Sequence, residues 1–415
     1  MREMKDSGIS WVGEIPKEWS VWRNKYIFKI TKDIVLPSKN YQLLSLTTTG
    51  IKEKDENDNG GKVPENYDGY QIVIEDDLVM CLFDLDCSAV FSGLSPYNGM
   101  ISPAYKVLKV KKRIANEQYY RYWFNYVGSK RFYKQYSKSL RFTLNADEFN
   151  RLFSLLPPLD EQQRIAEFLD RECGKIDGVK ADIQAQIDTL EQYKRSVITE
   201  AVTHGLNPSA PMKDSGIPWV GQFPTHWTKK KGKYILRYMS KPVKQDDGVI
   251  TCFRDGEVTL RSNRREDGFT MADKEIGYQG VDVGDLVVHG MDGFAGAIGI
   301  SDSRGKASPV LNVLNTKQNK KYIMYYLRSM AYGEVFTALS TGIRVRSCDL
   351  RWNKLAELLY PLPPIDEQNN IINYIDEQIA RTNDIIADKK SQIDTLDGYK
   401  KSLIYEYVTG KKEVV

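Results

Sequence analysis

The chain has 415 residues, of which 59 are Lys or Arg and 55 are Asp or Glu, so its formal charge is only +4. That length suits two to four domains, and an apolar fraction of 41% is enough to build buried cores, which excludes a disordered chain. We expect a cytoplasmic protein, because no apolar run approaches the roughly 18 residues of a membrane span, no apolar signal core follows the first residues, and the five cysteines form no CxxC pair.

The chain contains an internal repeat. Residues 4–19 (MKDSGISWVGEIPKEW) and 212–227 (MKDSGIPWVGQFPTHW) are identical at 11 of 16 positions, at an offset of 208. Residues 157–197 and 363–403 match at 17 of 41 positions, at an offset of 206. Two blocks in the same order at nearly the same offset indicate a tandem duplication.

Between the shared blocks, the two halves diverge. Residues 41–51, 70–83 and 249–260 are rich in β-branched and aromatic residues, which is typical of strands, and residues 116–136 and 319–339 have helical spacing. We therefore expect two globular α/β (α+β) regions. A domain duplicated for stability alone would drift evenly along its length. The alternation of matching and divergent stretches instead favours a common frame that carries two different specificities.

Each copy of the second shared block has the pattern of a long helix. Pro157-Pro158 and Pro363-Pro364 stand just before it, where proline is tolerated, and Asp160 and Asp366 are the expected N-caps. Apolar residues then recur at about seven-residue spacing, so each helix has a stripe that needs a partner. The residues expected to pack between the helices are Leu169, Ile176, Ile183, Leu190, Val197, Ile379, Ile386, Ile393, Leu396 and Leu403.

The nearest partner for each helix is the other copy. Each helix follows its own globular region, so pairing predicts a long antiparallel intramolecular coiled coil that separates the two regions, with a pseudo-twofold circular repeat. In that arrangement block 4–19 lies beside the end of the second helix, as block 212–227 follows the first. The alternative is that each helix packs only on its own globular region.

The charge is locally uneven despite the small total. Residues 106–141 contain eleven Lys or Arg, one acidic residue and nine aromatic residues. Residues 229–270 contain eleven basic and six acidic residues, and residues 317–346 contain six and one. Phosphate neutralisation depends on such local density, so these stretches favour a nucleic-acid partner. The alternatives are an ordinary solvated basic face and, for most of the rings, a helix core.

Polar and basic loops supply candidates for base contacts. Residues 261–265 (RSNRR) lie between strand-like segments, and Arg and Asn can bond guanine and adenine edges. Arg141 and Arg344 occupy equivalent positions in the two halves, so they suit a phosphate contact or a loop-shaping role better than base reading. The full set of predicted DNA contacts is Thr47, Thr48, Thr49, Lys52, Lys111, Lys112, Arg113, Arg141, Arg254, Arg261, Asn263, Arg264, Arg265, Arg344 and Arg346.

Sequence signals for catalysis or metal binding are absent. There is no GxxxxGK[ST] loop and no [ND]PP[YF] motif, and His204, His226 and His289 have no ligand or triad partner at a telling spacing. Glu161 and Glu367 recur at the helix starts, where compensation of the helix dipole explains them. We therefore predict no catalytic residues and no metal ligands in this chain.

The shared blocks resemble those of the specificity (S) subunits of type I restriction–modification systems. The resemblance rests on KDSGI-WVG-P-W (residues 5–19 and 213–227), on PP[LI]DEQ at the two helix starts, and on the two QIDTL[ED] segments. It covers essentially the whole chain in the order of that family. It implies target recognition domains at 1–156 and 206–362 and conserved spacer helices at 157–205 and 363–415.

The resemblance also implies a function. Each recognition domain reads one half of a split site in double-stranded DNA, and the helical pair sets the spacing of the half-sites. Two methyltransferase (M) subunits dock on S, use S-adenosylmethionine, which this chain does not bind itself, and flip the target adenine. Two restriction (R) subunits can join them. The S subunit itself is not an enzyme.

Two other functions stay open from the residues alone. One is a structural coiled-coil adaptor without nucleic acid, against which the basic clusters argue. The other is a fused restriction–methylation enzyme, against which the missing motifs argue.

Overall fold

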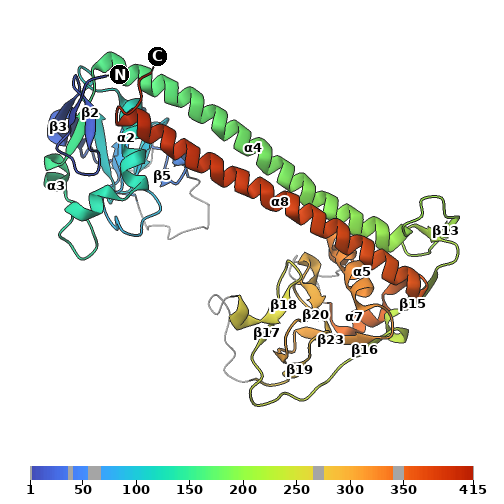
Figure 1. The fold of residues 1–415 in the computed structure, drawn as a ribbon. Helices are drawn as coiled ribbons and strands as arrows, with labels where there is room; N and C mark the ends of the chain where they lie inside the picture. The colour runs from blue at the N-terminus through green and yellow to red at the C-terminus, as the bar shows by residue number, and fades with distance from the viewer. Residues whose placement is uncertain (1, 36–40, 55–66, 265–274, 340–349, 415) are drawn as a thin grey trace. The chain divides into compact units, whose positions relative to one another are not determined.

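The computed structural model describes residues 2–35, 41–54, 67–264, 275–339 and 350–414. They form two compact units. Unit 1 contains Met1–Ile183 and Ser391–Val415, and unit 2 contains Gln184–Lys390. Two long helices, α4 (Leu159–His204) and α8 (Ile365–Val408), each contribute one part to either unit (Figure 1).

Unit 1 is a mixed α/β unit, as the sequence predicts. Its elements before α4 are β1 (Met4–Asp6), β2 (Glu14–Pro16), β3 (Ser20–Arg23), α1 (Asn24–Ile27), β4 (Phe28–Thr31), β5 (Leu44–Thr47), β6 (Gly50–Glu53), β7 (Gln71–Val73), β8 (Leu78–Met80), β9 (Ser92–Leu94), β10 (Gly99–Ile101), β11 (Lys106–Val110), α2 (Glu117–Ser129), η2 (Phe132–Tyr136), α3 (Ala146–Arg151) and β12 (Phe153–Leu156).

Unit 2 repeats this order with different loops. Its elements before α8 are β13 (Met212–Asp214), β14 (Gln222–Pro224), β15 (Thr228–Lys231), η3 (Gly232–Tyr234), β16 (Leu236–Tyr238), β17 (Ile250–Cys252), β18 (Val258–Leu260), η4 (Arg261–Asn263), β19 (Gln279–Val281), β20 (Leu286–His289), η5 (Gly293–Ala295), β21 (Ile298–Ile300), β22 (Gly305–Ala307), β23 (Leu311–Thr316), α5 (Lys320–Tyr332), α6 (Val335–Ala338), α7 (Trp352–Glu357) and β24 (Leu359–Leu362).

A four-stranded antiparallel sheet forms the centre of each unit. The strand order is β4-β11-β8-β9 in unit 1 and β16-β23-β20-β21 in unit 2, so the two sheets have the same topology. Side chains alternate between the faces: Leu78 and Met80 of β8 join the core under α2, whereas Val79 joins a second core on the opposite face. In unit 2, Leu286 and Val287 divide in the same way.

The long helices pair in an antiparallel manner within each unit. In unit 1, the rings of Phe168 and Tyr407 lie 4.4 Å apart, and Lys400 Nζ lies 2.6 Å from Asp177 Oδ2, so residue numbers rise along α4 as they fall along α8. In unit 2, Lys194 Nζ donates to Asn383 Oδ1 at 2.8 Å, and Lys389 contacts Gln186. The predicted antiparallel pairing is confirmed.

The helices also pack on the globular regions. Each helix therefore contacts both the other helix and a globular region, which combines the two predicted arrangements. One core of unit 1 joins Ile165 and Leu169 of α4, Leu403 and Ile404 of α8, and the aromatic face of α2. None of the ten apolar residues expected between the helices is exposed. Leu169, Ile176, Ile183, Val197, Ile386 and Leu403 are buried, and Leu190, Ile379, Ile393 and Leu396 are half-buried.

The expected N-caps of the long helices are wrong. The helices already begin at Leu159 and Ile365, directly after the proline pairs, so Asp160 and Asp366 fall inside the first turn. There their charge still suits the positive end of the helix dipole. At the other end, Gly205 and Gly410 follow the helices with φ values of 79° and 69°, in the left-handed region that glycine adopts readily.

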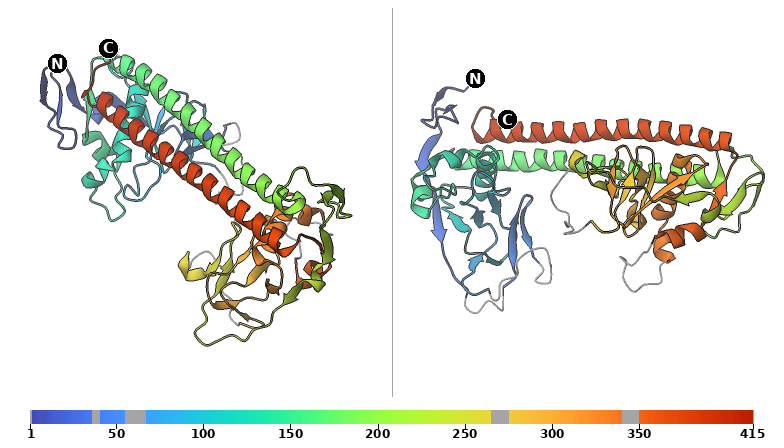
Figure 2. Two further views of the ribbon diagram at one scale, coloured as in Figure 1. Left: turned by 45° about the vertical axis from the view of Figure 1, so that its right-hand side comes forward. Right: turned by 90° about the horizontal axis from the view of Figure 1, so that it is seen from below.

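The circular arrangement of the repeat is present inside unit 1, which contains both chain ends (Figure 2). Lys411 Nζ, just beyond α8, donates to the carbonyl of Glu14 in the first shared block. The hydroxyl of Tyr119 donates to the carbonyl of Val408 at 2.9 Å. In unit 2, Tyr322 makes the same contact with Val202 near the end of α4, at 3.1 Å.

Candidate nucleic-acid interface

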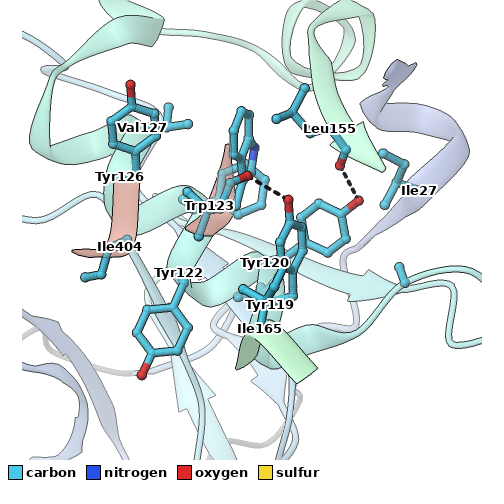
Figure 3. Close-up of a cluster of buried hydrophobic side chains, with 14 of the residues drawn as sticks. Ile27, Tyr119, Tyr120, Tyr122, Trp123, Tyr126, Val127, Leu155, Ile165 and Ile404 are labelled. Carbon is cyan, nitrogen blue, oxygen red and sulfur yellow. Dashed lines mark hydrogen bonds between the residues drawn. The ribbon is translucent and has the colours of Figure 1, made fainter. Parts of the chain in front are cut away.

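Most aromatic residues of the basic stretch form a core, whereas its cations lie nearer the surface. On α2, Tyr119, Tyr120 and Trp123 are completely buried (Figure 3). The Tyr120 hydroxyl donates to the carbonyl of Leu155 at 2.8 Å, and the indole of Trp123 donates to Ser154 Oγ at 3.0 Å. These rings therefore hold α2 on its sheet and are not available to a partner, which leaves the side chains of the surface as candidates for the predicted DNA contacts.

The predicted threonine loop is the turn of the β5–β6 hairpin. Thr47 Oγ1 accepts from the Thr49 amide at 3.2 Å and donates to the Gly50 carbonyl at 2.7 Å, so Thr47 shapes the turn. Thr48 and Thr49 are exposed at its tip. Lys52 is exposed on β6. The hairpin thus presents two hydroxyls and one ammonium group outward.

A groove of about 830 Å³ lies between this hairpin, α2 and the parts of α4 and α8 in unit 1. Thr48 and Thr49 line it, but its cations are already paired with carboxylates. Arg121 contacts Asp170, Lys180 contacts Asp397, and Lys400 contacts Asp177. Since each positive charge is compensated, the groove is a poor phosphate site, and the hairpin tip is the better candidate contact.

The predicted lysine cluster lies between β11 and α2. Lys111 Nζ donates to the carbonyl of Lys25 at 3.1 Å, and Lys112 Nζ lies 3.3 Å from Glu117. Arg113 is exposed. The structure thus places three adjacent cations on the surface in front of α2.

Arg141 belongs to a tight turn that follows η2. Its carbonyl accepts from the Asp84 amide at 3.2 Å, while its side chain is exposed. Sequence reasoning missed the residue beside it, Leu140, which is fully exposed. The shared pair Leu140-Arg141 and Ile343-Arg344 in the two halves was the signal that could have found it.

In unit 2 the predicted contacts lie on and beside the β17–β18 hairpin. Arg261 Nε donates to Thr251 Oγ1 at 3.4 Å, and Asn263 Nδ2 donates to Thr259 Oγ1 at 2.9 Å. Arg254 Nη2 lies 2.9 Å from Asp292 Oδ1. The structure therefore brings these polar groups together at one edge of unit 2.

Arg264 already has partners inside the protein. Its guanidinium lies 2.7 Å from Asp255 Oδ2 and 3.0 Å from Glu257 Oε2, and it stacks 4.2 Å from the centre of the Phe253 ring. The hydrogen bond with Asp255 raises the pKa of Arg264. A base contact by Arg264 would have to replace these bonds. Arg265, Arg344 and Arg346 lie outside the described residues.

The shared sequence blocks meet at the helix starts. The indole of Trp19 donates to Glu161 Oε2 at 2.9 Å, and in unit 2 the indole of Trp227 donates to Glu367 Oε1 at 3.0 Å. The blocks around these tryptophans and the PP[LI]DEQ blocks therefore recur together because they form one packing unit.

The glutamine of each DEQ triplet connects its long helix to the shorter helix of the same unit. Gln162 Oε1 accepts from the Asn116 amide at 2.8 Å, and Gln368 Oε1 accepts from the Asn319 amide at 3.0 Å. Asn116 and Asn319 are the N-caps of α2 and α5. The motif thus fixes the start of each aromatic helix.

Comparison with known proteins finds relatives that match nearly the whole chain. No known protein-family model matches the chain. A protein of Methanocaldococcus jannaschii, described as the specificity subunit of the type I restriction enzyme MjaX, is 22% identical over an alignment of 437 residues. The alignment covers 97% of this chain and 96% of the relative. The chain resembles a type I specificity subunit over its whole length.

Solved structures were compared with the fold as well, and one of them matches it closely enough to support it. A chain from a structure on complex assembly and conformational transition of the type I R-M system covers 96% of this chain and 99% of its own length, with a TM-score of 0.65 and 13% identity. The HsdS subunit from Thermoanaerobacter tengcongensis covers 96% and 98%, with a TM-score of 0.47 and 13% identity. The first match confirms the expected fold class.

Two absences apply to the described part of the chain. None of its helices combines the length and the apolar character that crossing a bilayer requires. In the same residues, no three His, Cys, Asp or Glu side chains are grouped so that they could hold a metal ion.

Proposed function

We propose that this chain is the non-catalytic, DNA-reading subunit of a type I restriction–modification complex. The observation that carries the proposal is that the two units share one internal architecture but present different outward hairpins. The sheet order, the Trp–Glu contacts and the helix starts are the same in both units, whereas the outward hairpins differ. Two readers of different half-sites require such a combination.

The exposed polar groups suit a DNA partner, because they combine hydroxyl and amide groups that can bond base edges with cations that attract phosphates. Unit 1 presents hydroxyls and a lysine at its β5–β6 hairpin, and unit 2 presents arginine and asparagine around its β17–β18 hairpin. Lysines in front of α2 add sequence-independent attraction to phosphates. A coiled-coil adaptor without nucleic acid needs none of these groups. DNA affinity that falls steeply with salt separates the two functions.

Chemistry is assigned to partners in this proposal. Two methyltransferase subunits bind S-adenosylmethionine and dock on this chain, and restriction subunits join when present. The antiparallel helical pair, to which each unit contributes, sets the spacing between the half-sites. Methyl transfer by the purified chain alone would instead support a fused enzyme.

Mapping methylated adenines in a genome that carries this chain and its methyltransferase subunit tests the proposal. We expect methylation confined to a split, asymmetric motif and lost when this chain is deleted. One helical turn inserted after Ile183, with another after Lys390 to keep the helices matched, lengthens the pair by about 6 Å. The accepted spacer should grow by about one to two base pairs, since bases rise about 3.4 Å along a strand. Methylation of the same motif without this chain would refute its role as the DNA-reading subunit. An unchanged spacer would refute the role of the helical pair in setting the spacing.

A further inference from the structure

A turn in unit 1 presents one aliphatic side chain entirely to solvent. Leu140 has a relative exposure of 101%, above that of every other large hydrophobic residue that the structure describes, the next being Ile276 at 77%. Leu140 and Arg141 are the two central residues of the turn Ser139–Phe142, which the Phe142 amide closes by donating to the Ser139 carbonyl at 3.0 Å. An apolar side chain held out in this way has no packing role within its own unit.

Side-chain hydrogen bonds make the Leu140 turn (Ser139–Phe142) rigid. The Thr143 amide donates to Ser139 Oγ at 2.7 Å, and Ser137 Oγ donates to the Thr143 carbonyl at 2.9 Å. Below the turn, the Leu144 amide donates to the Leu82 carbonyl at 2.8 Å. The loop is therefore preorganised, and a partner that contacts Leu140 does not have to order it first.

The surroundings of the turn are positively charged. Residues 130–143 contain five Lys or Arg and no Asp or Glu. Lys138 and Arg141 flank Leu140 and are exposed, and Lys134 lies 4.5 Å from the centre of the Phe142 ring. A leucine whose charged neighbours along the chain are all cations suits a partner that is apolar at one point and anionic around it. A DNA duplex has this chemistry, because stacked bases lie inside two rows of phosphates.

The second half of the sequence repeats the feature. Ser137 and Leu140-Arg141 correspond to Ser340 and Ile343-Arg344 at an offset of 203. Residues 340–349 lie outside the described residues, so this support comes from the sequence alone. An aliphatic residue before the same arginine, kept between two otherwise divergent surfaces, indicates a contact that does not depend on the base sequence.

We propose that Leu140 is a wedge that enters between two stacked base pairs of double-stranded DNA, while Arg141 holds a neighbouring phosphate. Inserted apolar side chains of this kind unstack a base step and bend the duplex, at a cost that added backbone contacts offset. The proposal deepens the proposed DNA-reading function and rests on it.

The test uses the assembled complex of this chain with its methyltransferase subunit. Duplexes carry 2-aminopurine at successive positions of the first half-site and its flanks, leaving out the adenine that is methylated, since a flipped base is also fluorescent. We expect fluorescence to rise at one step with the unaltered chain and to stay at the duplex level with Leu140→Ala. Affinity for the specific site should fall about tenfold. Leu140→Ile, which copies the second half, should keep both properties.

Ile74→Ala is the matched control, because Ile74 is an exposed aliphatic residue of the same unit at 43% exposure. It should change neither fluorescence nor affinity. Unchanged unstacking with Leu140→Ala would overturn the wedge. So would a loss confined to binding of the methyltransferase subunit, which would make Leu140 a protein contact. If the unaltered complex shows no preference for any DNA site, the proposed function fails before the wedge is reached.

Discussion

The two units hold their helix starts with the same Trp–Glu pair but complete it differently. In unit 1, Glu161 also accepts from Arg2 Nη2 at 2.9 Å, and only 7% of its side chain is exposed. In unit 2, the second partner of Glu367 is His226, whose Nε2 lies 2.7 Å from Oε2, and 28% of the Glu367 side chain is exposed. The indole contact is thus the retained part, and the second partner can be exchanged.

The same contrast between retained and exchanged groups holds throughout the two units. Groups that the two units share point inward: the tryptophans, the DEQ glutamines and the tyrosines of α2 and α5. Groups that differ lie on the outward hairpins, such as Thr48 in unit 1 and Asn263 in unit 2. Duplication therefore preserved what folds the unit and left free what could contact a partner.

Removing the shared tryptophan should have the largest effect on stability, and the effect should be nearly equal in the two units. Trp19 and Trp227 are completely buried, so Trp19→Ala and Trp227→Ala should each lower the local free energy of unfolding by about 3–5 kcal/mol. Phe in place of Trp keeps most of the volume and loses one hydrogen bond, which costs about 1 kcal/mol. Amide hydrogen exchange reports each unit separately. A large difference between the two alanine variants would break the equivalence of the units.

Neutralising the glutamate of the Trp–Glu pair should instead destabilise the two units to different extents. Glu161→Gln keeps an acceptor for the indole but takes from the guanidinium of Arg2, 19% exposed, its buried charge partner and leaves it the more exposed Glu18 at 3.6 Å, so we expect a loss of about 1–3 kcal/mol. Glu367→Gln should cost at most about 1 kcal/mol, because His226 is 49% exposed and water screens the pair. Amide hydrogen exchange at increasing urea concentration gives the free energy of unfolding of each unit and so measures the loss in both variants. Equal losses would mean that exchanging Arg2 for His226 as the second partner makes no difference to stability.

Much of the frame could be predicted from the sequence because its signals are local or repeated. The proline pairs and the apolar spacing gave the long helices, and the two copies gave their pairing. The Trp19–Glu161 contact joins residues 142 positions apart, and no local pattern reports such a distance. The expected caps Asp160 and Asp366 failed because each helix begins two residues earlier than such a cap requires, immediately after its second proline.

The candidate site was less accessible to prediction, because composition cannot show where a cation lies on the fold. Arg121 and Lys112 look alike in the sequence and both meet a carboxylate, yet Arg121 lines a groove with 31% of its side chain exposed, whereas Lys112 lies in front of α2 with 71% exposed. Exposure is equally hidden: Leu140 reads as an ordinary core residue until the turn places it outside.

The smallest effect should come from Arg264, and it should appear in one half-site only. Unit 1 has no arginine at the corresponding hairpin, so Arg264→Ala should weaken base discrimination in the half-site of unit 2 about five- to tenfold, the low end for a base contact. The effect is small because Arg264 must first leave Asp255 and Glu257, whose bonds it would exchange for those to DNA. Methylation rates on duplexes with single base changes in either half-site measure it.

Two further variants sharpen that result. Arg264→Lys keeps the charge but cannot bond a base edge through two parallel donors, so discrimination should fall almost as far as with alanine. Arg381→Ala removes an exposed arginine of α8 that pairs with Glu377 at 2.6 Å within the same unit, and it should leave discrimination unchanged. If Arg264→Ala weakens both half-sites equally, Arg264 acts on the frame that the units share. The hairpins would then not divide recognition between the units.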